Sequence, residues 1–388
     1  MGHVTSDVSA LLAALQPRYD AFLQDLAVLV NLDSGSFDRA DVEQVSAWLR
    51  TRCRTWGATI EEHPGGTYAD SFAAIVPSSG RGTVMLLGHM DTVFPHGTAA
   101  AHPFRVEGER ALGPGTCDMK GGLLTAIYAV EALRTLGFDH YAQLRFVCTS
   151  DEEVGAPSSR AFVERMAQGA DAVFVLEAAR ENGDIVGQRR GMGVFRLDVT
   201  GRSAHAGVEP QKGRNAALTL CRQVVALHAL NDYAAGRTIN AGTLHAGTRP
   251  NVVPAHAEAE IDLRADTIPE MERLLADAEA TLADAALEET SYTWQSTQYR
   301  PPWGPSAGTE RLVALAQQCA AVLGFYPSAV KTGGTSDGNF TAALGISTLD
   351  GLGPIGGLDH SPSEYIDCAS IMPRTALLAA LIQAVCAN

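Results

Sequence analysis

The order of apolar and polar residues over the first 190 positions predicts helices that alternate with short strands. Apolar residues recur at helical spacing in four segments: 8–30, 41–56, 123–136 and about 158–166. Four short runs are rich in apolar and β-branched residues: 72–76, 83–87, 143–148 and 172–176. A run that is almost wholly apolar, such as 83–87, is typical of a strand covered on both faces. We therefore expect an α/β domain in which helices pack against a sheet.

The pattern changes between residues 191 and 299. Alternation predicts strands at 194–200, 238–245, 257–263 and 292–299, and helical spacing predicts helices at 215–230 and 269–287. The order strand, helix, strand, strand, helix, strand is that of the ferredoxin-like arrangement. A proline-rich linker at 301–305 precedes further predicted elements: helices at 309–323 and 371–385 and a strand at 347–352. We interpret 191–299 as a domain inserted into a domain built from 1–190 and 300–388.

Length and composition agree with two globular domains. A chain of 388 residues exceeds the size at which a single core usually stops growing. The net charge of −15 argues against nucleic acid as a partner, because binding to phosphates needs clustered Lys and Arg. No apolar run approaches a membrane span, and the N-terminus does not resemble a signal peptide, so we expect a cytoplasmic protein without a membrane partner. A signal peptide trimmed from the chain would leave the same sequence, which keeps a periplasmic or secreted location open.

Acidic and histidine side chains follow several predicted strands. His89 and Asp91 come after the strand 83–87, and Glu177 comes directly after 172–176. The strand 143–148 runs into three consecutive acids, 151–153, whose mutual repulsion is costly unless solvent or a cation lies among them. That turn alone fits either a solvated surface turn or half of a site. Repetition of such residues at strand ends favours a site, because open α/β sheets bind ligands at the carboxyl edge.

The side chains available at this edge predict a metal site without sulfur. None of the seven cysteines stands in a CxxC pair, which indicates reduced thiols used for packing. The candidate ligands are two imidazoles and three carboxylates: His89, Asp118, Glu153, Glu177 and His360. Two divalent ions that share one carboxylate would use all five, and zinc suits this mixture best.

Two further acids near the predicted ligands have roles without binding metal. Asp91 is well placed to hold His89 by its second ring nitrogen. One carboxylate of the acidic turn remains to take a proton from the attacking water and to pass it to the leaving amine.

Six motifs follow one another along the chain: Gly88-His89-Met90-Asp91, Gly115-Thr116-Cys117-Asp118-Met119-Lys120-Gly121-Gly122, Asp151-Glu152-Glu153-Val154-Gly155, Leu176-Glu177, Ser203-Ala204-His205-Ala206-Gly207 and Asp359-His360-Ser361. Together they resemble the M20 metallopeptidase family, and within it the glutamate carboxypeptidase branch. The resemblance implies a zinc-exopeptidase-type catalytic domain with a mixed central sheet flanked by helices, and an inserted ferredoxin-like lid and dimerisation domain. It also implies two Zn²⁺ ions per subunit, which Co²⁺ or Mn²⁺ can replace, and a homodimer formed through the inserted domain.

The resemblance also implies a role for each site residue in the catalytic domain. His89 and Glu177 would complete one zinc site, and Glu153 and His360 would complete the other. Asp118 would bridge the two ions and precede a cis peptide bond, and Glu152 would be the general base.

In the inserted domain, the resemblance points to residues that contact substrate. His205 is similar to a family histidine that reaches the active site of the partner subunit and stabilises an oxyanion. Asn251, Arg264 and Arg300 match positions that bind the substrate carbonyl and carboxylate. Backbone N–H groups of the loop that contains Gly333 and Gly334 could bind the same carboxylate.

The substrate expected from this branch is a small N-acyl or peptidyl amino acid with a free carboxylate, cleaved at a C-terminal acidic residue such as glutamate. Some positions depart from the branch: Lys331 stands where Arg is frequent, and 335–338 (Thr-Ser-Asp-Gly) is closer to succinyl-diaminopimelate desuccinylases. An N-acyl-amino-acid deacylase of the acetylornithine, succinyl-diaminopimelate or aminoacylase type is therefore the second hypothesis. A metal-free member used for binding or as a scaffold is the third, and the filled ligand positions disfavour it. The acyl group stays open.

Overall fold

The computed structural model describes residues 2–387, which form two compact units. Unit 1 contains the chain up to Gln188, Pro305–Thr332 and the chain from Ser336 on, and unit 2 contains Arg189–Gly304 with Gly333–Thr335. Unit 2 is wider than the expected insert 191–299 because Arg189 and Trp303 pair through both backbone groups, with N···O distances of 3.1 and 3.0 Å.

Unit 1 is built on a mixed six-stranded sheet in the order β1-β2-β6-β3-β7-β14. The strands are β1 (Thr59–His63), β2 (Ser71–Pro77), β3 (Thr83–His89), β6 (Gln143–Thr149), β7 (Ala172–Val175) and β14 (Thr348–Leu349). Strands β6, β3, β7 and β14 run parallel, whereas β1 and β2 are antiparallel to their neighbours. Parallel strands end at the same edge of a sheet, so the segments after β6, β3 and β7 begin close to one another.

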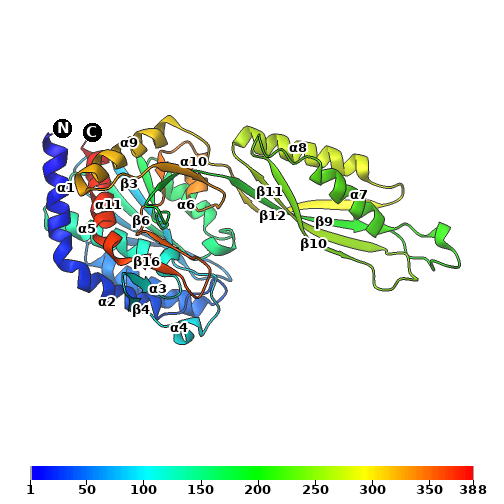
Figure 1. Cartoon of the computed structure of the whole chain (residues 1–388), viewed down its shortest axis with the longest axis horizontal. Coiled ribbons are helices and arrows are strands. Elements are labelled where there is room, and N and C mark those ends of the chain that lie inside the picture. The colour runs from blue at the N-terminus through cyan, green and yellow to red at the C-terminus, as the bar shows by residue number, and fades with distance from the viewer. Residues whose placement is uncertain (1, 388) are drawn as a thin grey trace. The chain divides into compact units, whose positions relative to one another are not determined.

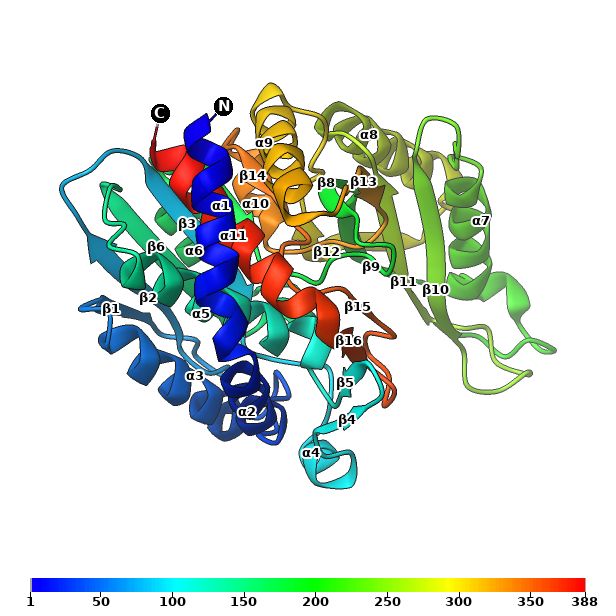
Figure 2. The ribbon, with the colours of Figure 1, turned by 60° about the vertical axis from the view of Figure 1, so that its left-hand side comes forward.

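Helices cover both faces of this sheet, as the apolar run 83–87 predicts. Val84 and Leu86 of β3 lie in one buried cluster, and Met85 and Leu87 lie in another on the opposite face. The helices of unit 1 are α1 (Gly2–Leu15), α2 (Tyr19–Val30), α3 (Arg39–Arg54), α4 (Thr98–Ala101), α5 (Gly121–Thr135), α6 (Arg160–Ala167), α9 (Ala307–Leu323), α10 (Gly338–Ala343) and α11 (Ile371–Cys386). Helices α1, α5 and α11 pack together over the first cluster, and α6 and α10 belong to the second (Figure 2).

Two helical segments differ in detail from their expected form. The single helix expected at 8–30 is two helices, α1 and α2, separated by a 3₁₀ turn at Gln16–Arg18. Pro17 accounts for the break, because proline has no N–H to donate within a helix. By length and composition alone, Cys368–Cys386 could cross a membrane, but 78% of its most apolar window is buried within the chain. That burial is characteristic of a core helix.

Several short strands of unit 1 have no counterpart among the expected elements. They form a four-stranded sheet, β15-β16-β5-β4, and a two-stranded sheet, β13-β8. Their bounds are β4 (Arg105–Glu107), β5 (Arg110–Leu112), β8 (Ile185–Arg189), β13 (Ala329–Thr332), β15 (Gly356–Gly357) and β16 (Tyr365–Asp367). Most span only two to four residues, which is too short for a period of two to be visible in the sequence.

Unit 2 is an antiparallel sheet in the order β10-β11-β9-β12 with helices α7 and α8 packed along it (Figure 1). The elements are β9 (Gly191–Thr200), α7 (Ala216–His228), β10 (Thr238–Ala246), β11 (His256–Ala265), α8 (Ile268–Ala285) and β12 (Ser291–Arg300). All six expected elements are present, and their order places the first and third strands at the centre, as in the ferredoxin-like arrangement. Leu197, Val199, Ala257 and Ala259 are buried beneath the helices, and the alternate residues of β9 and β11 form the open face.

Candidate metal centre

The predicted ligands of unit 1 lie at the carboxyl ends of its parallel strands. His89 is the last residue of β3, and Glu177 follows the end of β7 by two residues. The acidic turn begins just after β6, where Glu152–Val154 form a 3₁₀ turn. Asp118 and His360 come from loops, and all five residues meet in two groups.

The two groups share the carboxylate of Asp118. The first group is His89, Asp118 and Glu177, and the second is Asp118, Glu153 and His360. Oδ1 of Asp118 is 2.9 Å from Nε2 of His89, and Oδ2 of Asp118 is 3.2 Å from Nε2 of His360. Nε2 of His360 is also 3.2 Å from Oε2 of Glu153, and Nε2 of His89 is 3.7 Å from Oε1 of Glu177. One carboxylate therefore faces a histidine of each group.

Burial and mutual proximity shift the pKa of each of these groups. Burial opposes protonation of His89, but the carboxylates of Asp118 and Asp91 outweigh it and raise the pKa of this imidazole well above its usual value. Hydrogen bonds to Asp118 and Glu153 raise the pKa of His360 to about 11. Burial raises the pKa of Glu153, and it raises that of Glu177 well above the usual range. A cation bound at the centre would therefore compete with protons for these groups.

The residues fit divalent cations. Oε1 of Glu153 is buried and has no hydrogen-bond partner among the described residues. A buried carboxylate oxygen without a partner is costly, and a cation would satisfy it. In each group one atom per residue lies within 4.8 Å of the others, and every such atom is an imidazole nitrogen or a carboxylate oxygen. Zinc, cobalt and manganese all accept such donors.

A residue that sequence reasoning missed holds the loop of Asp118. Oε1 of the fully buried Glu364 accepts the backbone N–H groups of Cys117 and Asp118, at 2.7 and 2.8 Å. Oε2 accepts the N–H of Gly115 at 3.1 Å, and burial raises the pKa of Glu364 to about 8. The peptide bond from Asp118 to Met119 is cis, as the resemblance implies. The sequence carried no clear signal for this role, because the strand that follows Glu364, β16, has only three residues.

Asp91 lies beside the second ring nitrogen of His89. Nδ1 of His89 lies 3.0 Å from the backbone carbonyl of Asp91 and 3.5 Å from its carboxylate. The buried carboxylate also accepts the N–H groups of Glu152 and Glu153, both at 3.2 Å, and the hydroxyl of Ser36 at 2.7 Å. Asp91 therefore contacts the histidine through its backbone carbonyl and its carboxylate, and it holds the acidic turn through its carboxylate.

Of the three adjacent acids, Asp151 has a structural role. Its carboxylate accepts the backbone N–H of Ser158 at 2.6 Å and bonds to the hydroxyl groups of Ser158 and Ser159. This leaves Glu152 and Glu153 at the start of the turn, where Asp91 holds their backbone. Glu153 joins the second group, and Glu152 remains outside both groups.

In unit 2 the structure brings His205 and Asn251 together. Both residues are exposed, and their loops pair through the backbone, with the N–H of Ala206 donating to the carbonyl of Asn251 at 3.0 Å. The N–H of Gly207 donates to Nδ1 of His205 at 3.1 Å. A neutral imidazole that accepts at Nδ1 carries its proton on Nε2, so His205 presents a donor to solvent.

The two predicted arginines lie in one row of the sheet of unit 2. Arg264 of β11 and Arg300 of β12 are both paired with Met192 of β9, which places them on the face of the sheet opposite the helices. Arg264 is partly exposed, pairs with Asp262 at 3.0 Å and donates to the carbonyl of Gly333 at 3.0 Å. Arg300 is only 2% exposed. The carbonyl oxygens of Gly333 and Gly334 accept hydrogen bonds from Arg264 and Arg189. These bonds use the carbonyl groups of the loop and not its N–H groups.

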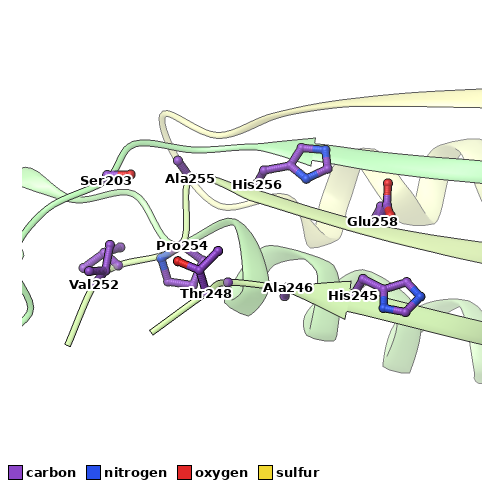
Figure 3. Close-up of a pocket in the computed structure, with 11 residues that line it drawn as sticks. Ser203, His245, Ala246, Thr248, Val252, Pro254, Ala255, His256 and Glu258 are labelled. Atoms are coloured by element: carbon purple, nitrogen blue, oxygen red, sulfur yellow. The ribbon is translucent and has the colours of Figure 1, made fainter. Parts of the chain in front are cut away.

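Two other groups of histidine and acids are already satisfied by protein partners. In unit 1, the carboxylate of Asp33 near His96 accepts the N–H groups of Gly97 and Ala99, both at 2.8 Å. In unit 2, His256 and Glu258 of β11 and His245 of β10 border a pocket of about 320 Å³ (Figure 3). Arg196 pairs with both acids of that group, Asp198 and Glu258. None of the predicted ligands lies in these groups.

Comparison with known proteins identifies a family for the chain. A family model described as peptidase family M20/M25/M40 matches residues 85–384. Carboxypeptidase G2 of Pseudomonas sp. (strain RS-16) is 27% identical over 382 residues, covering 96% of this chain and 91% of that protein. Succinyl-diaminopimelate desuccinylase of Bordetella petrii is 30% identical over 309 residues, covering 75% of this chain and 79% of that protein.

A solved structure shows the same fold. Aminopeptidase PepT of Bacillus cereus matches with a TM-score of 0.80 at 23% identity, covering 95% of this chain and 98% of that one. The expected α/β fold, with helices flanking a mixed sheet, is confirmed. Members of this family are typically metal-dependent, and the two groups around Asp118 are where this chain could bind metal. The chain belongs to peptidase family M20/M25/M40 and is a hydrolase of that family.

Proposed function

We propose that the chain is a dinuclear zinc-dependent carboxypeptidase that hydrolyses the amide bond to a C-terminal acidic residue, glutamate, in small N-acyl or peptidyl substrates. The observation that carries the proposal is the position of Asp118, whose two oxygens each face the histidine of a different group. A shared carboxylate with one histidine and one further carboxylate on each side is the donor set that two zinc ions need.

Each residue of the centre then has a task. His89 and Glu177 hold one ion, Glu153 and His360 hold the other, and Asp118 serves both. Divalent ions bound there supply Lewis acidity, which polarises the scissile carbonyl and makes water more acidic. The carboxylate of Glu152 takes the proton of the attacking water and passes it to the nitrogen of the leaving amino acid. Asp91 supports this transfer because its carboxylate holds the backbone N–H of Glu152.

Residues of unit 2 contribute substrate binding in this proposal. The exposed Nε2–H of His205 donates to the oxyanion that develops on the scissile carbonyl, and the amide of Asn251 binds the same oxygen. Arg264 and Arg300 bind carboxylates of the substrate, since guanidinium groups bind carboxylates through two parallel hydrogen bonds. Their common row in the sheet supports joint binding of one anionic group.

We further propose a homodimer formed through unit 2. Among residues 2–387, no strand pairs with the outer edge of β10. Leu218 and Val225, two helical turns apart on α7, are 52% and 72% exposed. An open strand edge and an exposed apolar stripe are both features that a second copy of the chain could cover.

The test is a panel of N-acyl and peptidyl amides that vary in the C-terminal residue, assayed with zinc supplied and with the metal content of the protein measured. We expect glutamate substrates to be cleaved faster than those that end in alanine or diaminopimelate. An active preparation without zinc would contradict the proposed cofactor.

An N-acyl-amino-acid deacylase is the second candidate. Two observations favour it: the sequence Thr-Ser-Asp-Gly at 335–338, and the 30% identity to a succinyl-diaminopimelate desuccinylase. A preference for succinyl-diaminopimelate in the same panel would select this candidate. The metal groups and Glu152 would keep their tasks in either case.

A further inference from the structure

Arg374 is a buried cation that donates hydrogen bonds to backbone groups. It lies in the first turn of α11 and is 1% exposed. Each nitrogen of its guanidinium donates to a carbonyl oxygen: Nε to that of Gly353 at 3.2 Å, Nη1 to that of Gly183 at 3.1 Å, and Nη2 to that of Gly351. All three acceptors are uncharged, so these bonds do not neutralise the guanidinium.

This position is unfavourable for a cation. The positive end of a helix dipole lies at the first turn, where Arg374 stands. Burial lowers the pKa of Arg374 from 12.5 to about 10, against the smaller opposing effect of Asp184. An apolar side chain would fill a buried space without this cost. The three bonds to carbonyl groups therefore indicate that Arg374 serves to fix the segments that it reaches.

The segments that Arg374 binds hold the backbone around Glu177. Beyond the end of β14, the N–H of Gly353 donates to the carbonyl of Glu177 at 2.9 Å. The residue after Gly353 accepts the N–H of Ala179 at 3.0 Å. Gly183 lies in the turn that follows along the chain. Arg374 is thus bonded both to the segment that pairs with Glu177 and to the turn after it.

Close contacts leave this backbone little freedom. A Cβ at Gly353 would lie 2.8 Å from the carbonyl oxygen of Leu176 and 3.0 Å from that of Glu177. In α5, a Cβ at Gly122 would lie 1.9 Å from the same oxygen of Leu176. The backbone that carries Glu177 is therefore enclosed between α5 and the segment that Arg374 binds. A shift of that segment would move Glu177.

The backbone position matters for Glu177 because its side chain has no hydrogen bond to orient it. Among residues 2–387, no donor lies within hydrogen-bond distance of its carboxylate, and Nε2 of His89 is 3.7 Å away. The other members of the first group are held: His89 by the carbonyl of Asp91, and the loop of Asp118 by Glu364. The direction of the Glu177 carboxylate therefore depends on where its backbone is fixed.

We propose that Arg374 is a positioning residue for Glu177 and sets the cation affinity of the first metal group from outside both groups. The inference rests on the proposed function for the binding of cations at this group. It adds a determinant of affinity that acts through the backbone, since Arg374 bonds only to the carbonyl groups of segments next to Glu177.

Arg374→Lys tests the proposal. A lysine keeps the charge but has a single nitrogen, which cannot reach three separate carbonyl oxygens as a guanidinium does. We expect the first group to lose about 10- to 100-fold in zinc affinity, as after removal of a residue that orients a ligand. The change is made in two backgrounds: Glu153→Gln, which leaves the first group, and Glu177→Gln, which leaves the second. Chelator competition should show the loss only in the Glu153→Gln background.

Leu378→Ala is the matched control for stability. Leu378 is a fully buried residue of the same helix, and its truncation should lower the free energy of unfolding without changing zinc affinity. Denaturant titrations measure the stability of both variants. If Arg374→Lys leaves the affinity of the first group unchanged, or if Leu378→Ala lowers it as much, the inference is overturned.

A milder variant decides the question if Arg374→Lys does not fold. Gly183→Ala keeps the buried guanidinium and disturbs the turn that it binds, because alanine is strained at the φ of +85° found there. It should weaken zinc binding at the first group and leave the second unchanged. Equal affinities in Gly183→Ala and the unmodified protein would count against the proposal.

A readout without metal separates failure of this inference from failure of the proposed function. Hydrogen exchange is measured by mass spectrometry on the full chain. In Arg374→Lys, peptides that contain Gly353 or Ala179 should exchange faster, whereas the amides bound by Glu364 should not change. If the unmodified protein binds no cation, the proposed function fails, but faster exchange would still support the role of Arg374 in holding Glu177. Unchanged exchange in both peptides would overturn that role.

Discussion

The carboxylate of Glu364 accepts the backbone N–H of Asp118, with 2.8 Å between Oε1 and the nitrogen. The same carboxylate also accepts N–H groups of Cys117 and Gly115, so three donors converge on one buried side chain. The residue that both metal groups share is therefore positioned by an acid that is not itself a ligand. Groups that orient ligands in this way affect metal affinity strongly.

Glu364→Gln tests this relationship. An amide has a single acceptor oxygen, so at least one of the three N–H groups would face an NH₂ group and lose its partner. We expect metal affinity to fall by about 10- to 100-fold and the free energy of unfolding to fall by about 1–3 kcal/mol. Chelator competition and denaturant titration measure the two effects. Glu109→Gln, at an exposed position, is the control, and unchanged affinity in Glu364→Gln would refute the positioning role.

The neighbouring acids Glu152 and Glu153 should respond differently to the same substitution. Both keep their backbone bonds to Asp91 when the side chain becomes an amide, so each change tests the carboxylate alone. Glu152→Gln should retain both metals and lose about 10²- to 10⁴-fold in kcat, the usual contribution of a general base. Glu153→Gln should lose one metal per chain. Metal analysis and kinetics on both variants test which acid is the general base and which is the metal ligand. Loss of metal in Glu152→Gln would reverse these two assignments.

His205→Ala should reduce kcat by about 10²- to 10³-fold, as loss of one oxyanion donor does, with the metal content unchanged. His245→Ala, at another exposed histidine of unit 2, is the control. If His205 acts in the active site of a partner subunit, mixing His205→Ala with Glu152→Gln should restore part of the activity, because mixed dimers contain one site with both residues intact. Molar mass in solution is measured alongside. Dimers without rescue would mean that His205 acts within its own chain.

Lys120 should give the stability of the protein a distinct dependence on pH. Burial lowers its pKa from 10.5 to about 8, and its Nζ donates to the carbonyl of Leu32 at 2.7 Å. Between these two pH values the unfolded chain binds more protons at this position than the folded one, so stability should rise with pH. The rise should be absent from Lys120→Met.

Denaturant titrations at both ends of this interval measure the slope. The exposed Lys212 provides the control, since Lys212→Met should keep the slope of the unmodified protein. The difference between the variants isolates the contribution of Lys120 from those of other titrating groups. Parallel slopes in Lys120→Met and the unmodified protein would contradict a lowered pKa.

The local pattern of apolar residues was sufficient to predict those residues of the candidate metal centre that lie at the ends of strands. His89 and Glu177 follow strands whose apolar character is visible in the sequence, and parallel pairing brings such ends together. The six elements of unit 2 were predicted for the same reason, because each is long enough to show its period.

Contacts between distant segments could not be predicted in this way. Glu364 is 246 positions from Asp118, and Ser36 is 55 positions from Asp91. No period or spacing connects such pairs, and each residue alone resembles an ordinary loop residue. The low exposure of Arg300 also depends on tertiary packing, since an arginine at the end of a polar strand is usually exposed.

The sharing of Asp118 makes the two metal positions interdependent. Each histidine is bonded to a different oxygen of one carboxylate, so the charge and orientation that one position imposes on Asp118 are felt at the other. In the proposed dinuclear centre, a cation at the first position would draw electron density from the oxygen of Asp118 that the second position uses. The two metal affinities would then depend on each other and would have to be measured as a pair.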